Sequence, residues 1–240
     1  MGIVGAGRVG NALAAALRDA GVEVEGPLGR GGRPSRCDAI LLCVPDAEIA
    51  AAAEVVTAAA PLIGHTSGAT PLSALAHAGV DAFGLHPLQT FAEGGASFEG
   101  IGCAVGGSTP RALAAADALA RCLGMRPFEL ADADRPAYHA AASIASNFLV
   151  TLEAAAERVA ATTGLDRELL VPLVRQTVEN WAALGPERAL TGPVARGDDA
   201  TVERQREAVV AAAPELEDLW DSLVAATRAL PTADSPLRTG

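Results

Sequence analysis

Hydrophobic residues in the first half of the chain fall into short runs rich in branched side chains, separated by helix-like stretches. The clearest run, residues 39–44, is apolar at every position, as expected for a parallel strand buried on both faces. Other strands are predicted at residues 3–4, 22–27, 62–65, 82–85, 102–105 and 126–130. Strands that alternate with helices predict an α/β fold with a doubly wound, mostly parallel sheet.

Two helices are predicted between the first strands. One covers residues 11–20, where apolar positions recur every four residues and Gly21 is expected to end the helix. Asp46 is expected to cap the N-terminus of the next helix.

The pattern changes after Leu130, where no further strand is predicted. Apolar residues spaced by three and four from Tyr138 to Val159 predict one helix over residues 134–163, ~45 Å long at the α-helical rise. A helix of that length normally packs along another helix or another subunit. Further helices are predicted at residues 167–184, 201–212 and 214–229. We therefore expect an α/β domain over 1–130, an all-α C-terminal domain over 131–230 and a disordered tail over 231–240.

A glycine motif, Gly5-Ala6-Gly7-Arg8-Val9-Gly10, joins the first predicted strand to the first helix. This context is typical of dinucleotide-binding Rossmann-type domains, where the glycines permit a tight turn, close approach of the pyrophosphate and close helix packing. The free N–H groups of the helix N-terminus favour a phosphate. The alternative is a glycine-rich turn without a ligand. We assign cofactor binding to Gly5, Gly7, Arg8, Val9 and Gly10.

The residue type about 20 positions beyond the motif indicates which cofactor binds: an acid there favours NAD and an arginine favours NADP. Residues 29–36 contain arginines and no acid, so Arg30 predicts NADP over NAD. Glu25 is the competing candidate, but it falls inside a predicted strand. Arg30 could also be a solvated loop charge. Val44, Pro45 and Ser67 follow predicted strands, where open α/β sheets bind ligands, and are added to the cofactor contacts.

Several uncharged polar residues could carry chemistry. His86 and Gln89 follow the strand predicted at 82–85. On the long predicted helix, four polar residues share one sector of the surface: His139, Ser143, Ser146 and Asn147. No charged residue occurs from 137 to 152, which favours a pocket wall over a solvent face. A core histidine hydrogen-bonded by serines, or small residues chosen for helix packing, are the alternatives.

A further candidate segment, residues 190–198, lies between predicted helices and contains Thr191 and Arg196. Arg196 could bind a substrate carboxylate through two hydrogen bonds. It could equally pair with Asp198 or Asp199 and hold the loop together.

Composition narrows the possible partners. The net charge is -11, and all 18 basic residues are arginines, because the chain has no lysine. Dispersed arginines on an acidic chain argue against nucleic acid as a partner. No apolar run approaches the ~20 residues of a membrane span, and Met1 leads into the motif and not into a signal peptide, so we expect a cytoplasmic protein. The four cysteines lack metal-ligand spacing, which predicts reduced thiols and no metal.

On these motifs the chain resembles the Rossmann-like proteins with the C-terminal domain called DUF2520, a branch of the 6-phosphogluconate dehydrogenase-like reductases. The segments that carry the resemblance are 5–10, 44–45, 67–68, 86–89, 138–147 and 191–198. The resemblance implies an NADP-dependent oxidoreductase that forms a homodimer through its helical domain. Gln205 departs from the pattern, which looks to favour histidine there, so we assign it no role.

More distantly, the chain is similar to pyrroline-5-carboxylate reductase, prephenate dehydrogenase and ketopantoate reductase. Some enzymes of this superfamily use a catalytic lysine, which this chain lacks. Histidine is the side chain best matched to proton transfer near neutral pH.

The resulting hypothesis is hydride transfer between NADPH and a small carbonyl, imine or hydroxy acid bound between the domains. His139 would act as the acid or base. The remaining residues predicted to be catalytic or to bind the substrate are His86, Asn147, Ser143, Gln89, Thr191 and Arg196. Two alternatives stay open: a non-catalytic NADP(H)-binding sensor and an F420-dependent reductase.

Overall fold

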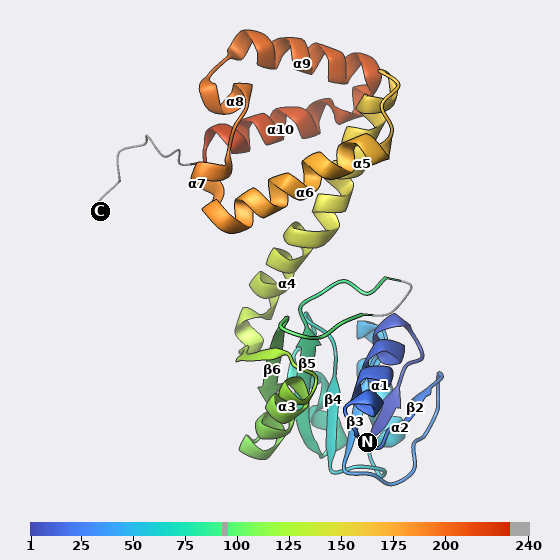
Figure 1. Ribbon diagram of the computed structural model, residues 1–240. Helices are drawn as coiled ribbons and strands as arrows, with labels where there is room; N and C mark the ends of the chain where they lie inside the picture. The colour runs from blue at the N-terminus through green and yellow to red at the C-terminus, as the bar shows by residue number, and fades with distance from the viewer. Residues whose placement is uncertain (93–95, 231–240) are drawn as a thin grey trace, which may run out of the picture. The chain divides into compact units, whose positions relative to one another are not determined.

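The computed structural model describes residues 1–92 and 96–230 and divides into two compact units, Met1–Ser146 and Asn147–Gly240 (Figure 1). The division falls later than the boundary expected near residue 131, because the helix that begins at Arg135 packs onto the sheet of the first unit. The tail predicted over 231–240 lies outside the described residues.

The described part of the first unit is built on a seven-stranded sheet with the order β2-β1-β3-β4-β5-β6-β7. All neighbouring strands are parallel except β5 and β6, which confirms the predicted doubly wound, mostly parallel fold. The strands are β1 (Gly2–Val4), β2 (Glu25–Leu28), β3 (Ala39–Leu42), β4 (Leu62–His65), β5 (Asp81–Pro87), β6 (Gly102–Gly107) and β7 (Arg126–Glu129). All seven were predicted, but β2 begins three residues later than expected, so Glu25 is its first residue and not an interior one.

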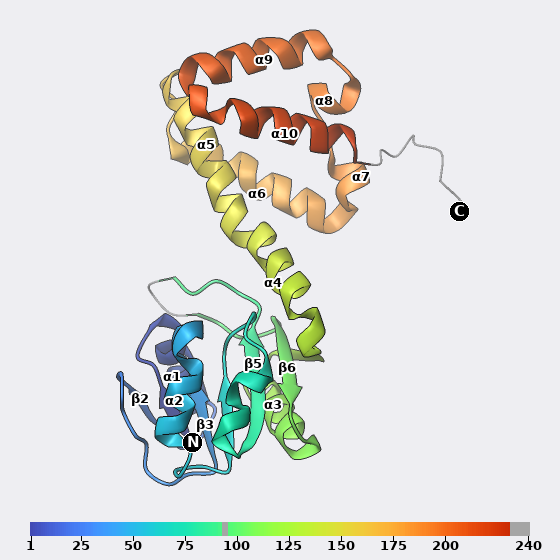
Figure 2. The same ribbon diagram turned by 180° about the vertical axis from the view of Figure 1, so that it is seen from behind.

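Helices cover both faces of this sheet. On one face lie α1 (Arg8–Asp19) and α3 (Pro110–Cys122), as Figure 1 shows. On the other lie α2 (Ile49–Val56) and the 3-10 segment η2 (Leu72–Ala78), seen from behind in Figure 2. Strands β1 and β3 are buried at every residue, which explains why their sequences contain no polar side chain.

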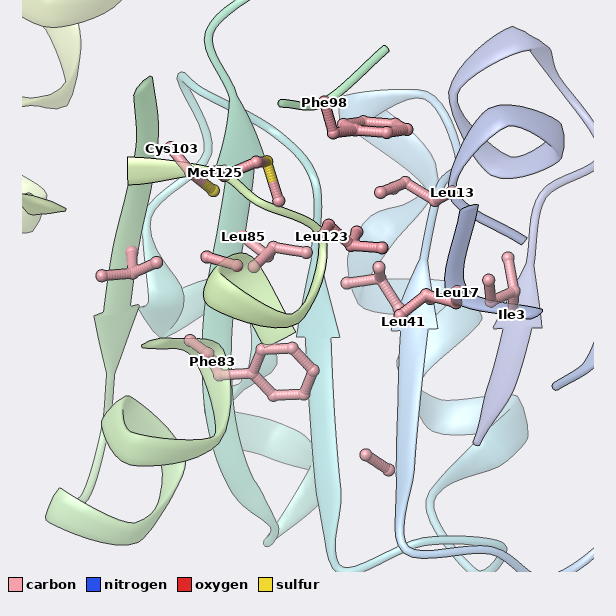
Figure 3. Close-up of a cluster of buried hydrophobic side chains, with 14 of the residues drawn as sticks. Ile3, Leu13, Leu17, Leu41, Phe83, Leu85, Phe98, Cys103, Leu123 and Met125 are labelled. Atoms are coloured by element: carbon pink, nitrogen blue, oxygen red, sulfur yellow. The ribbon is translucent and has the colours of Figure 1, made fainter. Parts of the chain in front are cut away.

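The core is divided between the two faces by the alternation of side chains along each strand. Ile3 and Leu41 contribute to the cluster under α1 and α3, together with Phe83, as Figure 3 shows. Their neighbours Val4 and Ile40 contribute to the cluster under α2. Each of these five side chains is at most 3% exposed.

The strand order places a topological switch point between β1 and β3. From β1 the chain goes to β2 on one side, then crosses to β3 on the other. Open α/β sheets bind their ligands at such a point, outside the carboxyl ends of the strands.

The predicted long helix is present but is not α-helical throughout. It begins as α4 (Arg135–Ser143), continues through a π-helical segment (Ile144–Phe148) and ends as α5 (Leu149–Ala161). The extra residue of a π-turn changes the angular positions of later side chains. His139 and Ser143 therefore lie in α4, whereas Ser146 and Asn147 lie in the π-helical segment.

The remainder of the described chain is helical, as predicted. Helix α6 occupies the predicted range, Arg167–Leu184. The other elements are α7 (Pro186–Ala189), α8 (Pro193–Arg196), α9 (Asp199–Ala212), the 3-10 turn η5 (Pro214–Leu216) and α10 (Glu217–Arg228). Among the described residues, no helix has the length and apolar character that a membrane crossing requires.

Candidate functional site

Close backbone packing positions the glycine motif. Gly5 has a φ of 110°, and a Cβ there would lie 2.2 Å from the carbonyl oxygen of Cys43. A Cβ on Gly10 would lie 1.9 Å from the carbonyl oxygen of Gly5. These two glycines are required by the contact of α1 with β1 and β3, because any side chain would force the elements apart.

Gly7 differs from both. Its backbone has an ordinary φ of -79°, and a Cβ there would meet no heavy atom within 4 Å. Gly7 is the N-cap of α1, and no side chain caps the helix or places an acid in its first turn. The N-terminal N–H groups are thus open to an anion at the switch point, and these residues fit the pyrophosphate of a dinucleotide.

The other residues assigned to the cofactor occupy the same edge of the sheet. Arg8 is exposed at the start of α1, whereas the side chain of Val9 packs partly into the core. Pro45 precedes the 3-10 turn η1 (Asp46–Glu48). Asp46 makes no capping hydrogen bond, so its predicted role as the cap of the next helix is wrong: α2 begins only after this turn.

A pocket of about 270 Å³ opens beside this turn, at the carboxyl ends of β1 and β3. Arg30 and Glu48 are its two charged residues, and they form an ion pair with 2.6 Å between Nη2 and Oε1. The remaining lining residues are apolar or glycine: Val4, Gly31, Gly32, Val44, Ala51, Ala52 and Val55.

Glu25 lies at the opposite edge of the sheet, at the amino end of β2. Its carboxylate accepts hydrogen bonds from the backbone N–H of Ser35 at 2.8 Å and from the Ser35 hydroxyl at 3.3 Å. The Glu25 carboxylate therefore already has hydrogen-bond partners, and it lies at the end of β2 opposite to the switch-point edge.

A second group of polar residues lies at the carboxyl end of β4 and β5, where α4 packs. Nδ1 of His86 is 2.6 Å from the hydroxyl of Tyr138. The rings of His86 and His139 lie 6.4 Å apart between centroids, and both imidazoles approach Gly68. A Cβ on Gly68 would be 2.9 Å from Nε2 of His86 and 3.1 Å from Cδ2 of His139. The structure thus brings the two predicted histidines to one turn.

A buried arginine holds α4 in this position. Arg135 is only 2% exposed, and its Nε donates to Asp132 at 2.7 Å while Nη1 donates to the backbone oxygen of Ser67 at 3.3 Å. Asp132 also accepts from the backbone N–H of Leu72. The Arg135–Asp132 ion pair neutralises the buried charge, and the hydrogen bond from Arg135 to Ser67 connects the start of α4 to the turn after β4.

Space for the guanidinium comes from two glycines that face each other across β5 and β6. Gly84 pairs with Gly106, and a Cβ on Gly84 would lie 3.0 Å from Nη2 of Arg135. Paired glycines in mid-strand are a sequence signal for a large side chain packed on the sheet, and Arg135 was not predicted as a site residue. Nor was Tyr138, whose hydroxyl contacts His86.

The side chains of Ser67 and His65 form hydrogen bonds within the turn that follows β4. The Ser67 hydroxyl accepts hydrogen bonds from the backbone N–H groups of Ala69 and Thr70, at 3.2 and 2.9 Å. The Ser67 N–H donates to Nδ1 of His65, which is fully buried. The proton of neutral His65 is therefore on Nε2, which has no hydrogen-bond partner.

Burial controls the protonation of this cluster. It lowers the pKa of His65 to about 4, and the charge of Arg135 adds to that effect. It also lowers the pKa of His86 to about 4, with further lowering by His139 and Arg135. Burial raises the pKa of Tyr138 to about 12. His86 and Tyr138 are therefore neutral at pH 7.

The other predicted substrate and catalytic residues are more dispersed. Gln89 is half-buried after β5, and its buried Nε2 has no hydrogen-bond partner among the described residues. Ser143 is half-buried at the end of α4, and Asn147 is exposed in the π-helical segment. Both belong to the continuous helical stretch that starts at Arg135.

Thr191 and Arg196 belong to the second unit and are exposed there. Asp198 caps α9 through the Thr201 N–H, and Asp199 pairs with Arg228. Neither carboxylate forms a salt bridge with Arg196 within the described residues, so the alternative in which Arg196 holds its own loop is not observed.

The four cysteines have free thiols, as predicted, and they differ in exposure. Cys103 is buried, whereas Cys122 is exposed at the end of α3.

The low pKa of His65 makes the stability of the protein depend on pH. Its folded pKa lies below the unfolded value, so the unfolded chain binds more protons between pH 6.5 and 4, and the free energy of unfolding falls as pH decreases through that window. His65 accounts for roughly 3 kcal/mol of this loss. We expect His65→Gln to flatten the curve, measured by urea unfolding at several pH values. Identical slopes for both proteins would contradict this origin.

Comparison with known proteins places this geometry in context. The family model described as "Domain of unknown function (DUF2520)" matches residues 101–227, a little over half of the chain. No curated protein matches the sequence significantly.

Three solved structures share the fold. A candidate NADP oxidoreductase from Bacteroides fragilis is 21% identical, with a TM-score of 0.82 over 95% of this chain and 96% of that one. A Thermotoga maritima protein is 24% identical, with a TM-score of 0.74 over the same shares. The reductive aminase of Aspergillus terreus, solved with NADPH and ethyl levulinate, is 16% identical, with a TM-score of 0.62 over 94% and 91%. The chain thus has a Rossmann-like fold, and it belongs to the DUF2520 family.

Proposed function

We propose that the protein is an oxidoreductase that binds NADP(H) and transfers a hydride to or from a small carbonyl, imine or hydroxy acid. The observation that carries this proposal is the open N-terminus of α1 at the switch point, where a Cβ on Gly7 would meet no heavy atom within 4 Å. Two proteins with the same fold support it: one is a candidate NADP oxidoreductase and another was solved with NADPH.

Two observations favour NADP over NAD. Glu25, the acid that could bind an unphosphorylated ribose, is at the amino end of β2 and hydrogen-bonded to Ser35. Arg30 is on the pocket at the carboxyl end of β1, where an arginine can bind a 2′-phosphate.

Proton transfer in a lysine-free chain is assigned to the histidines near Gly68. When bound, the dinucleotide supplies or accepts the hydride. His139 is exposed at the surface of α4, so its imidazole can exchange a proton with the oxygen or nitrogen of a substrate. His86 is neutral and fixed by Tyr138, which suits it to orient a substrate through Nε2. Arg196 in the second unit remains the candidate partner of a substrate carboxylate.

The cofactor site is tested by Gly7→Val. A Cβ at this position meets no heavy atom within 4 Å, so we expect a nearly unchanged melting temperature but a dissociation constant for NADPH raised at least about tenfold. Isothermal titration calorimetry measures the affinity. Gly10→Ala serves as the contrast, because its Cβ clashes with Gly5 and should lower the melting temperature. Unchanged NADPH affinity in Gly7→Val would exclude this binding mode.

The catalytic assignment is tested by His139→Ala, after a screen of small ketones, 2-oxo acids and imines with NADPH. Loss of a general acid should lower kcat by about 10² to 10⁴ and leave the NADPH dissociation constant unchanged. The measurement is NADPH absorbance under saturating substrate. Unchanged kcat would remove His139 from the mechanism, and tight NADPH binding by the wild type without turnover on any compound would favour the sensor alternative.

We also propose that two copies pair through the helical unit. No residue of α6 is buried in the single chain. Its large apolar side chains Leu169, Leu173 and Trp181 are each about 60% exposed. Helix α5 likewise has no buried residue. Large apolar side chains in such number on neighbouring helices are typical of a protein interface.

The dimer is tested by Trp181→Glu, which places a charge in the centre of the apolar surface. We expect the dimer dissociation constant to rise at least about 30-fold, measured by analytical ultracentrifugation. Val55→Glu, an equally drastic change at an exposed position of α2, should leave the assembly intact. A wild-type monomer, or equal effects of the two variants, would contradict the proposal.

A further inference from the structure

The pocket beside η1 combines apolar walls with two charged side chains at the edge of the sheet where the glycine motif lies. Its volume of about 270 Å³ is near the lower end of small-molecule pockets. Side chains from β1, the end of β3 and α2 form apolar walls: Val4, Val44, Ala51, Ala52 and Val55. Apolar walls suit the faces of a purine ring, and the pocket adjoins the switch point where the glycine motif lies.

Among the residues that the structure describes, two charged side chains line this pocket. Arg30 comes from the loop after β2 and is 83% exposed, while Glu48 comes from the end of η1 and is 35% exposed. The less exposed carboxylate sits on a hydrogen-bonded turn, because the Glu48 N–H donates to the Pro45 oxygen at 2.8 Å. Glu48 is thus the better fixed of the two groups, and Arg30 reaches toward it.

The two charges favour different ribose groups. A guanidinium binds a 2′-phosphate through charge-assisted hydrogen bonds. A carboxylate accepts hydrogen bonds from the 2′- and 3′-hydroxyls and repels a phosphate at the same place. Because an exposed ion pair contributes little net free energy, a phosphate can displace Glu48 from Arg30 at small cost. The repulsion by Glu48 remains after displacement.

We propose that Glu48 is a specificity-determining residue that weakens the preference for the 2′-phosphate set by Arg30. Glu48 accepts the hydroxyls of an unphosphorylated ribose and opposes the phosphorylated one, so the wild-type pocket prefers the 2′-phosphate less strongly than Arg30 alone would make it. This inference rests on the proposed function, because it assigns the pocket to the adenosine end of the nicotinamide cofactor.

The test uses two fragments that differ only in the 2′-phosphate, adenosine 2′,5′-bisphosphate and adenosine 5′-monophosphate. Their dissociation constants are measured by calorimetry, without any turnover. In Glu48→Gln we expect the bisphosphate to bind about tenfold more tightly and the monophosphate several-fold more weakly. In Arg30→Gln we expect the bisphosphate alone to weaken, by about tenfold or more.

Glu54→Gln is the matched control. Glu54 is exposed on α2 and does not line the pocket, so both affinities should stay at their wild-type values. If Glu48→Gln changes both fragments by the same factor, or neither, Glu48 does not determine specificity, while the proposed function stands. If the wild-type protein binds neither fragment, nor NADPH or NADH, the proposed function and this inference both fail.

Discussion

The contact between the start of α1 and the ends of β1 and β3 is the constraint on which the rest of the first unit depends. Gly5 and Gly10 allow backbone to lie against backbone, at distances that no Cβ would tolerate. That contact points the helix N-terminus at the switch point and leaves Leu13 and Leu17 to pack on Ile3 and Leu41 in the core. One close approach therefore determines both the binding edge and the packing beneath it.

Much of this architecture could be predicted because it follows from local patterns. Apolar runs bounded by turn residues marked all seven strands, and the glycine motif marked the binding edge. The start of β2 was predicted too early, because Val22 and Val24 look like strand residues in the sequence. In the structure they pack on the core before the strand begins. The π-helical segment was not predictable from apolar spacing, since that spacing presupposes the α-helical period.

The candidate site was only partly predictable, because its geometry arises from contacts distant in sequence. His86 and His139 were identified as polar residues at a strand end and on a helix, but their approach to Gly68 depends on how α4 packs. Tyr138 acquires its role through His86, 52 residues away, and Arg135 acts through Ser67, 68 residues away. Nor does the local sequence around Arg30 show that its guanidinium pairs with Glu48.

The arginine buried over Gly84 and Gly106 also limits how the sequence can change. Any side chain at Gly84 would come within about 3 Å of the guanidinium, and replacing Arg135 by a small residue would leave Asp132 charged and without its partner, above a void on the sheet. Single substitutions at these positions should therefore each be unfavourable, although a combined replacement by apolar residues that fill the same volume could be tolerated. Among relatives, the two glycines, the arginine and the aspartate would then be inherited or lost together, as one unit of evolutionary change.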